Sequence, residues 1–237
     1  MSNSKYELMA DKTIDVFGRQ LFRIRALNSF GSVNAGDEGG YVESESNLSD
    51  KGNAWVSGDA WVYGNAWVYG NAGVSGDAQV SGDARVYGDA RVYGDARVSG
   101  NAWVSGDAWV YGDAWVFGDA WVFGDARVYG DAQVSGDARV YGDAQVSGDA
   151  QVFGNAWVSG DARLSERSAI FWASNVGSEF GTLTVFRCES GIGVRRGCFF
   201  GTPEDFLAAV EQKHGADSKI GREYHLLMQV ALSRVSE

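Results

Sequence analysis

The stretch Gly52-Asn53-Ala54-Trp55-Val56-Ser57 opens a six-residue unit that the chain repeats nineteen times without a break, ending at Ser165. Each unit reads Gly-[Asp/Asn]-Ala-x-Val-x, and the valine position changes only once, to Leu164. A short unbroken period is typical of a solenoid, in which each unit contacts only its neighbours. The repeat therefore predicts the architecture, and it leaves little room for catalytic residues.

Alternation inside each unit predicts which side chains point inward. Ala54 and Val56 lie on one side of a short strand and Trp55 on the other. Gly and Asp or Asn form a corner, because glycine adopts positive φ freely and Asp or Asn can bond its own backbone. Three sides close a coil of about eighteen residues, so nineteen units give about six coils stacked ~4.8 Å apart. We predict a triangular parallel β-helix about 30 Å long, with Ala and Val inside.

The residues before the repeat, 1–51, predict an N-terminal β cap. Apolar Phe22, Ile24 and Ala26 alternate with arginines, as in a half-buried strand, and residues 16–21 suggest a hairpin before it. A solenoid needs such an end, because an open coil exposes its apolar column and an unpaired strand edge. The repeat itself, residues 52–165, forms the β-helix.

The residues after the repeat, 166–237, predict a small α+β domain that caps the rod and carries self-association. Segments 169–173, 182–187 and 193–200 are expected to be strands. Thr202 and Pro203 suit a helix start, and this helix should end at His214 before Gly215. A second helix is expected over about 219–233, and its apolar face comprises Ile220, Tyr224, Leu227, Met228 and Ala231.

The acidic charge of the chain limits its possible partners, and its cysteine content indicates its compartment. The net charge is −11, of which the repeats contribute −8 through six Arg and fourteen Asp. A surface this acidic should repel nucleic acid and anionic membrane, so we expect neither as a partner. We see no signal-peptide pattern and no membrane-spanning run. Cys188 and Cys198 are too few for a disulfide scaffold, so we expect a cytoplasmic protein with free thiols.

The spacing of small, aliphatic and Gly/Asp residues resembles the hexapeptide-repeat left-handed β-helix. Residues 36–43, 47–49 and 52–56 are similar to hexapeptide-repeat proteins of bacteriophages and gut bacteria, described as hypothetical or polymer-forming. Residues 197–202, 214–215 and 223–224 are similar to the same group. The resemblance implies the left-handed sense and a phage or prophage origin. It implies no activity.

The outward position between Ala and Val carries the clearest hint of function. Trp fills it eight times, Arg six times and Gln four times. Taking every third unit collects three faces, and the face with the most Trp consists of Trp67, Arg85, Trp103, Trp121, Arg139 and Trp157. A side-chain ladder that supports the rod is one interpretation, and an interface or ligand platform is the other. We take these six residues as the candidate binding residues.

Catalytic chemistry has little support in the sequence. Enzymes of the hexapeptide-repeat class are mostly acyltransferases with a histidine base, whereas these repeats contain no His, Cys or Lys. Cys198 and His214 could suggest a thiol nucleophile and its base, but Phe199 and Phe200 indicate a packed strand around a structural cysteine. The Asp rows suit turn formation better than calcium. We therefore expect no catalytic residue, metal or cofactor, and the roles of Cys188, Cys198, His214 and His225 stay unassigned.

These observations predict a non-enzymatic, rigid β-solenoid scaffold, phage-associated and homo-oligomeric through residues 166–237 or a Trp face. Two alternatives stay open. The first is a module that binds a glycan or another planar ligand on a Trp/Arg face. The second is an acyltransferase with an unrecognised site.

Overall fold

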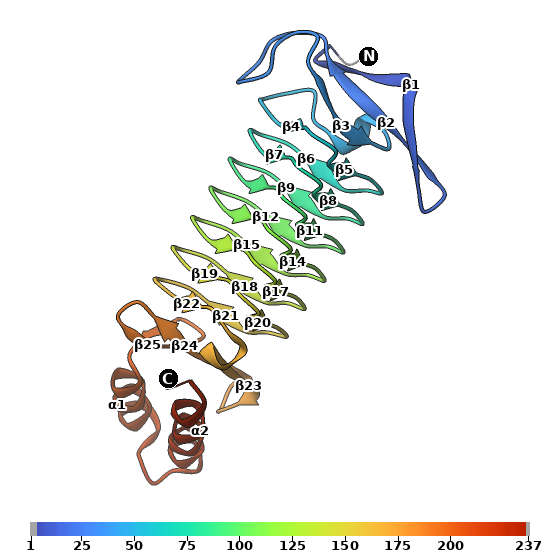
Figure 1. The fold of residues 1–237 in the computed structure, drawn as a ribbon. Helices are drawn as coiled ribbons and strands as arrows, with labels where there is room; N and C mark the ends of the chain where they lie inside the picture. Colours follow the sequence, from blue (N-terminus) through green and yellow to red (C-terminus); the bar gives the residue numbers. More distant parts are fainter. Residues whose placement is uncertain (1–3, 236–237) are drawn as a thin grey trace.

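The computed structural model describes residues 4–235 as a rod of stacked β-coils, capped by a β hairpin at one end and by a small α+β unit at the other (Figure 1). Nineteen two-residue strands, one per repeat unit, stack in parallel to form the rod. The mainly β architecture and the parallel β-helix are as predicted. The left-handed sense stays a prediction.

The strands form three flat faces, and the sheets are named here A, C and D. Sheet A contains β5 (Trp61–Val62), β8 (Gln79–Val80), β11 (Arg97–Val98), β14 (Trp115–Val116), β17 (Gln133–Val134) and β20 (Gln151–Val152). Sheet C contains β6 (Trp67–Val68), β9 (Arg85–Val86), β12 (Trp103–Val104), β15 (Trp121–Val122), β18 (Arg139–Val140) and β21 (Trp157–Val158). Sheet D contains β4 (Trp55–Val56), β7 (Gly73–Val74), β10 (Arg91–Val92), β13 (Trp109–Val110), β16 (Arg127–Val128), β19 (Gln145–Val146) and β22 (Arg163–Leu164). Each strand pairs with the strand eighteen residues later, which confirms the three predicted faces.

The interior is a column of alanine and valine. Every alanine and every valine of the repeat pattern is fully buried, and Leu164 is 1% exposed. Strand β3 (Glu38–Val42) pairs in parallel with β5, and Leu48 bridges Val68, so a partial turn precedes the repeats and the solenoid has about seven turns. The apolar column therefore continues without interruption from the N-terminal cap to the last repeat.

Corner glycines allow successive coils to approach each other closely. Gly100 has φ +68°, and a Cβ built on it would lie 2.9 Å from the backbone nitrogen of Gly118 on the next coil. An L-residue would be strained by the positive φ and would also press on backbone that cannot move aside. The corner thus requires glycine for two separate reasons.

The N-terminal cap is built from the predicted hairpin. Strands β1 (Tyr6–Val16) and β2 (Arg19–Ala26) pair antiparallel, β2 pairs with β3, and the 3₁₀ turn η1 (Glu45–Asn47) follows. Trp55, expected to point outward, is only 9% exposed, because Tyr6 and Phe30 pack edge-on against its indole. The first outward tryptophan therefore belongs to the cap and not to the free surface.

Lys5 closes the top of the column with a buried ammonium. Its Nζ donates hydrogen bonds to the carbonyl oxygens of Ala54 at 2.6 Å and Ser49 at 3.1 Å, and it lies 4.5 Å from the Phe30 ring centroid. Burial lowers the pKa of Lys5 from 10.5 to about 8, against the opposing effect of the Asp50 charge. The folded protein therefore releases this proton at a lower pH than the unfolded chain does.

This difference predicts a pH dependence of stability. Between pH 8 and 10.5 the unfolded chain binds more protons at Lys5 than the folded protein, so stability should rise with pH. Relative to Lys5→Met, the free energy of unfolding of the wild type should rise by on the order of 2 kcal/mol across this window. Urea unfolding at several pH values measures the difference, and other titrating groups cancel between the two proteins. Parallel curves for the two proteins would contradict the assignment to Lys5.

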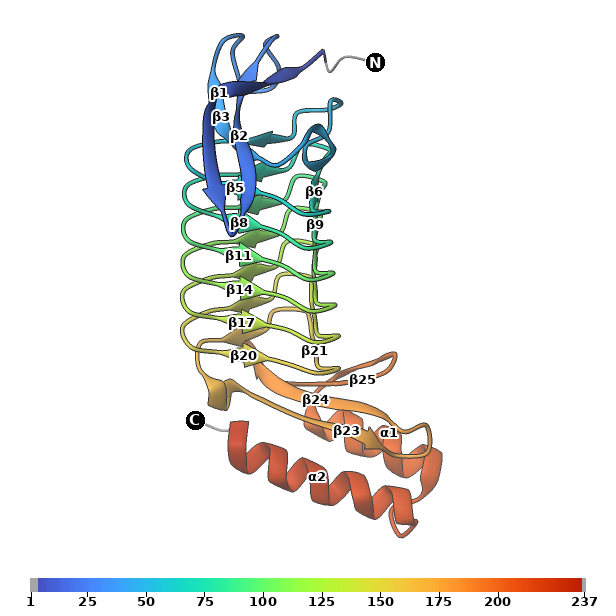
Figure 2. The ribbon, with the colours of Figure 1, turned by 90° about the vertical axis from the view of Figure 1, so that its right-hand side faces the viewer.

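The C-terminal unit has an antiparallel sheet between the solenoid and two helices (Figure 2). After the 3₁₀ turn η2 (Arg167–Ala169) come β23 (Ile170–Val176), β24 (Gly181–Cys188), β25 (Gly191–Arg196) and β26 (Phe199–Gly201). The prediction of one strand over 193–200 is wrong, because a turn at Gly197 and Cys198 separates β25 from β26. Helix α1 (Pro203–His214) has the predicted Thr202 cap, with Gly215 after it, and α2 (Lys219–Val235) follows.

The central strand β24 buries both of its faces. Phe186 is fully buried in the solenoid core, and Thr184 Oγ1 accepts a hydrogen bond of 3.1 Å from the backbone N–H of Trp157. Leu183 and Val185 point the other way, into a second core formed with α1 and α2. Strand β24 thus closes the last coil and supports the helices.

Candidate functional site

The six predicted candidate residues lie together on sheet C, and we call their surface the sheet-C face. Their order along the rod is Trp67, Arg85, Trp103, Trp121, Arg139 and Trp157, one residue per coil. Arg85 lies 5.1 Å from the Trp103 ring, and Arg139 lies 5.1 Å from Trp121 and 4.7 Å from Trp157. The indoles of Trp103 and Trp121 stack 4.8 Å apart at 4°. The structure therefore brings five of the six candidates, all except Trp67, into one continuous aromatic and cationic stack.

This stack covers the flat sides of its central tryptophans. Trp103 lies between Arg85 and Trp121, and Trp121 lies between Trp103 and Arg139. Trp121 is nevertheless 37% exposed, so the edge of its indole faces solvent. Trp67 stands outside the stack and packs on Tyr69 with ring centroids 4.1 Å apart. A ligand on this face would meet ring edges and guanidinium groups rather than open ring faces.

Sequence reasoning missed a second aromatic set, in the last position of the repeat unit. Ten of the nineteen units carry Tyr or Phe there and nine carry Ser. Tyr69 stacks on Tyr87 at 4.8 Å, and Tyr93, Tyr111 and Tyr129 stack in sequence at 4.9 Å. Burial raises the pKa of the Tyr69, Tyr93 and Tyr111 phenols. These aromatic residues recur eighteen residues apart in the sequence, and that spacing could have revealed that their rings stack on successive coils.

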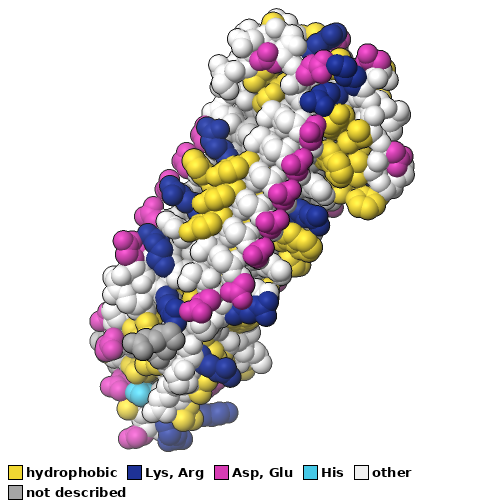
Figure 3. Space-filling model, in the orientation of Figure 1, with side chains coloured by type: hydrophobic (Ala, Val, Ile, Leu, Met, Phe, Trp, Pro, Cys, Tyr) yellow, Lys and Arg dark blue, Asp and Glu magenta, His cyan; other side chains and the backbone are white. Residues whose placement is uncertain are grey.

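Charge is distributed unequally among the three faces. Figure 3 shows rows of acidic side chains running along the rod beside apolar and basic side chains. The corner row that precedes the strands of sheet A consists of six aspartates: Asp59, Asp77, Asp95, Asp113, Asp131 and Asp149. The row that precedes the strands of sheet C contains only three, because Asn65, Asn101 and Asn155 replace the others. Counted with the corner row that precedes it, the sheet-C face carries a net charge of −1, because Arg85 and Arg139 offset two of the three aspartates, against −5 for sheet A and −2 for sheet D.

Two adjoining hollows lie along the C-terminal half of the sheet-C face. The first has a volume of about 350 Å³ and is lined by Asn101, Trp103, Asp119, Trp121, Asp137 and Arg139. The second, of about 450 Å³, shares Asp137 and Arg139 and extends past Trp157 to Phe180 and Arg195 of the C-terminal unit. Four of the six candidate residues therefore line one extended groove, and Trp67 and Arg85 do not line either hollow.

The C-terminal unit adds six residues to this groove that the sequence did not indicate, and Arg195 and Phe180 are the most informative of them. The Arg195 guanidinium lies 5.7 Å from the Trp157 ring and 5.4 Å from the Tyr141 ring, which extends the stack. Within residues 4–235, its buried Nε has no hydrogen-bond partner. Phe180 is 72% exposed and adopts φ +48°, an unusual conformation for an aromatic residue. The groove therefore ends at an exposed apolar side chain and a partly buried cation.

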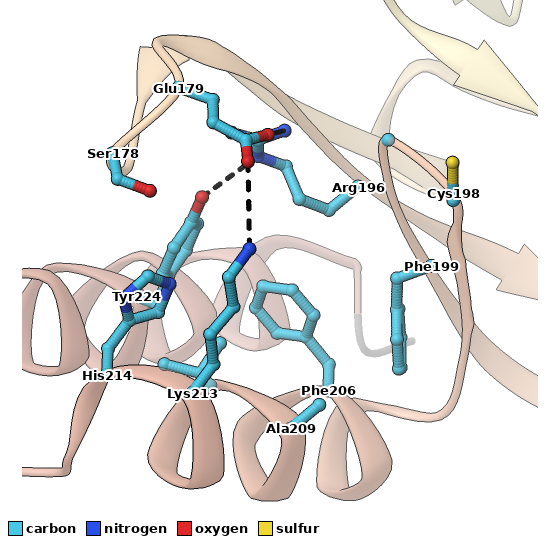
Figure 4. A pocket seen from close by; sticks show the side chains of 12 residues that line it. Ser178, Glu179, Arg196, Cys198, Phe199, Phe206, Ala209, Lys213, His214 and Tyr224 are labelled. Atoms are coloured by element: carbon cyan, nitrogen blue, oxygen red, sulfur yellow. Dashed lines mark hydrogen bonds and ion pairs between the residues drawn. The ribbon is translucent and has the colours of Figure 1, made fainter.

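A separate pocket of about 330 Å³ lies between α1, the β23–β24 turn and the β25–β26 turn (Figure 4). Cys198 and His214 both line it, but they lie on opposite sides of the pocket in Figure 4, so the thiol and the imidazole do not form a nucleophile–base pair. Cys198 is exposed in a turn, and the expectation of a packed structural cysteine there is wrong. Its neighbour Phe199 turns into the pocket instead.

The other two residues without an assigned role, Cys188 and His225, interact with neighbouring groups of the protein. Burial raises the pKa of the Cys188 thiol to about 12, and the nearby Asp161 carboxylate adds to the shift, so this thiol is protonated at neutral pH. His225 Nδ1 lies 2.9 Å from the Gly221 carbonyl oxygen, and its Nε2 lies 3.2 Å from Glu211.

Among the described residues we find no group of His, Cys, Asp and Glu suited to hold a metal ion. None of the described helices is long and apolar enough to cross a membrane.

Comparison with known proteins supports the solenoid. Residues 78–92, 90–106 and 132–148 match the family model described as YdcK beta solenoid repeat. These segments cover part of the rod, and together with the structure they identify the chain as a β-solenoid protein. No curated protein matches the chain.

Proposed function

We propose that this protein is a rigid, non-enzymatic scaffold that self-associates through its sheet-C face. The observation that carries the proposal is the coincidence of three properties on one face. It has four tryptophans, it carries the smallest net negative charge of the three faces, and it contains the extended groove. Two copies of so acidic a chain repel each other least where their aspartates are fewest. Aromatic residues and arginine are also the side chains that protein interfaces favour.

A protein partner suits this face better than a glycan. Sugar rings bind tryptophan by packing on the flat side of the indole, where the ring presents its largest area. In this protein Arg85, Trp121 and Arg139 already cover the flat sides of Trp103 and Trp121. Exposed indole edges, aspartates and guanidinium groups instead offer small apolar contacts with polar neighbours, as a protein surface does. The glycan alternative is therefore the weaker one.

The helices of the C-terminal unit offer less for self-association than their sequence suggests. Tyr224, Met228 and Ala231 of the predicted apolar face are buried in the second core, with Leu227 packed against them. Leu226 and Val230 are the large apolar residues of α2 that stay exposed. The apolar face of the second predicted helix supported the expectation of self-association there, and the protein covers that face itself. We therefore assign self-association to the sheet-C face.

The remaining parts of the proposal depend on the resemblance and composition described above. We assign the chain to the hexapeptide-repeat left-handed type and propose a phage or prophage origin with a cytoplasmic location. No nucleic acid or membrane partner is proposed, because the net charge of −11 opposes both. Acetyl-coenzyme A turnover by the purified protein would contradict the non-enzymatic role.

A double substitution tests the interface. Trp103→Gln with Trp121→Gln keeps an outward residue that the repeat already uses at Gln79 and Gln133, so the fold should survive. We expect self-association to weaken at least tenfold, about 1.4 kcal/mol, because the centre of the groove loses its apolar area. Sedimentation velocity over a range of concentrations measures the change.

The matched control is Trp109→Gln with Trp115→Gln, which removes two exposed tryptophans from sheets D and A. This variant should associate like the wild type. A wild-type protein that stays monomeric at high concentration refutes the self-association. A Trp103/Trp121 variant that melts earlier but keeps its assembly shows that the stack only supports the rod. Glycan-array binding that this variant loses would favour the glycan alternative instead.

A further inference from the structure

The pocket beside α1 has an apolar floor of fixed geometry. Phe206 and Tyr224 are 3% and 4% exposed, and their rings meet edge-to-face with centroids 5.2 Å apart. Phe199 packs against Phe206 at 5.3 Å, and Val210 completes the wall. Side chains packed in this way hold their positions, so the pocket is formed before any ligand arrives.

A nearly buried guanidinium borders this floor. The Arg196 side chain is only 14% exposed, and its Nε donates a hydrogen bond of 2.9 Å to the Tyr224 hydroxyl. One terminal nitrogen donates to the Val176 carbonyl oxygen at 3.3 Å. Gly181 makes room for the other, because a Cβ there would lie 2.5 Å from Nη1. The surrounding residues thus fix a cation beside an apolar cavity.

The negative charge that faces Arg196 is held loosely. Glu179 Oε2 lies 3.9 Å from Arg196 Nη1, and Glu179 Oε1 lies 3.6 Å from Lys213 Nζ. Both distances are longer than a hydrogen bond. The Glu179 side chain is 69% exposed and comes from the turn between β23 and β24. In Figure 4 it lies above Lys213, beside Arg196. Because an exposed pair of this length contributes little stability, another carboxylate can replace Glu179 at small cost.

We propose that this pocket binds a small carboxylic acid with an apolar body. The ligand carboxylate takes the place of Glu179 between Arg196 and Lys213, and its apolar part lies on Phe199, Phe206 and Val210. Guanidinium groups bind carboxylates through charge-assisted hydrogen bonds, which are stronger than the present ion pairs. The volume of about 330 Å³ suits a molecule with one ring or a short alkyl chain. Free phosphate would leave the apolar floor unused.

Two exposed residues allow a test with effects of opposite sign. Glu179→Gln removes the competing carboxylate, so 3-phenylpropionate should bind at least threefold more tightly than to the wild type. Lys213→Gln removes one of the two cations and should weaken binding at least threefold. Lys219→Gln, an exposed lysine at the start of α2 that does not line the pocket, is the matched control and should change nothing. Arg196 is left intact because it also holds Tyr224 and the Val176 carbonyl.

Nuclear magnetic resonance titration of backbone amides measures the affinity and the location together. Shifts should concentrate on Gly197, Ala209 and their neighbours, and 3-phenylpropanamide and inorganic phosphate should each bind at least tenfold more weakly than the acid. Equal binding of acid and amide would overturn the proposal. So would identical affinities of the Lys213 and Lys219 variants, or the absence of saturable shifts in Glu179→Gln. None of these results depends on self-association through the sheet-C face.

Discussion

Replacing Phe186 with alanine is expected to lower the free energy of unfolding by about 3–5 kcal/mol. Phe186 is fully buried at the end of the solenoid, where its ring closes the alanine and valine column. Its loss leaves a cavity beneath the last coil and weakens the contact between β24 and the rod. An opened coil end exposes unpaired strand edges, so the variant should also aggregate during heating. Thermal and urea unfolding with light scattering measure both effects.

Phe180→Ala is the matched control, since it removes the same ring from a 72% exposed position in the turn before β24. Its stability should stay within about 0.5 kcal/mol of the wild type, as for most surface substitutions. Equal losses for the two variants would show that Phe186 does not close the rod.

A single methyl group at a corner of the solenoid should be nearly as damaging. Gly100→Ala is expected to cost about 2–4 kcal/mol, because it adds strain at positive φ to a backbone clash. The added Cβ would lie 2.9 Å from the Gly118 nitrogen, and neither coil can withdraw without breaking its ladder of hydrogen bonds. Urea unfolding measures the loss.

Gly73→Ala makes the same change at an outward position of β7. The nearest heavy atom to its new Cβ would be Arg91 Nη1, at 4.0 Å, and the φ of Gly73 lies outside the left-handed region. This variant should be unchanged, or more stable by about 0.4–1 kcal/mol, because alanine restricts the unfolded chain. A loss at Gly73 as large as that at Gly100 would show that the corner geometry is not the cause.

The sequence by itself determined the solenoid and the composition of its faces. An unbroken period of six with inner alternation admits few structures, because a shift of one residue would expose every valine. Trp103 and Trp121 had to be neighbours once three units closed a coil, and their side chains had to point outward. The Thr202 cap and the end of α1 were likewise readable, because capping depends on residues within one turn.

Other features depended on contacts between distant segments, which no local pattern encodes. Trp55 is covered because Tyr6 and Phe30 of the cap fold over it, although its repeat unit is like the others. Cys198 is exposed because the chain turns there to pair β26 with β25. The apolar face of α2 was recognisable, but only packing decided that the protein's own sheet would cover it. Likewise, the pocket beside Arg196 exists because two turns and a helix meet, so the tertiary structure alone placed a cation against an apolar floor.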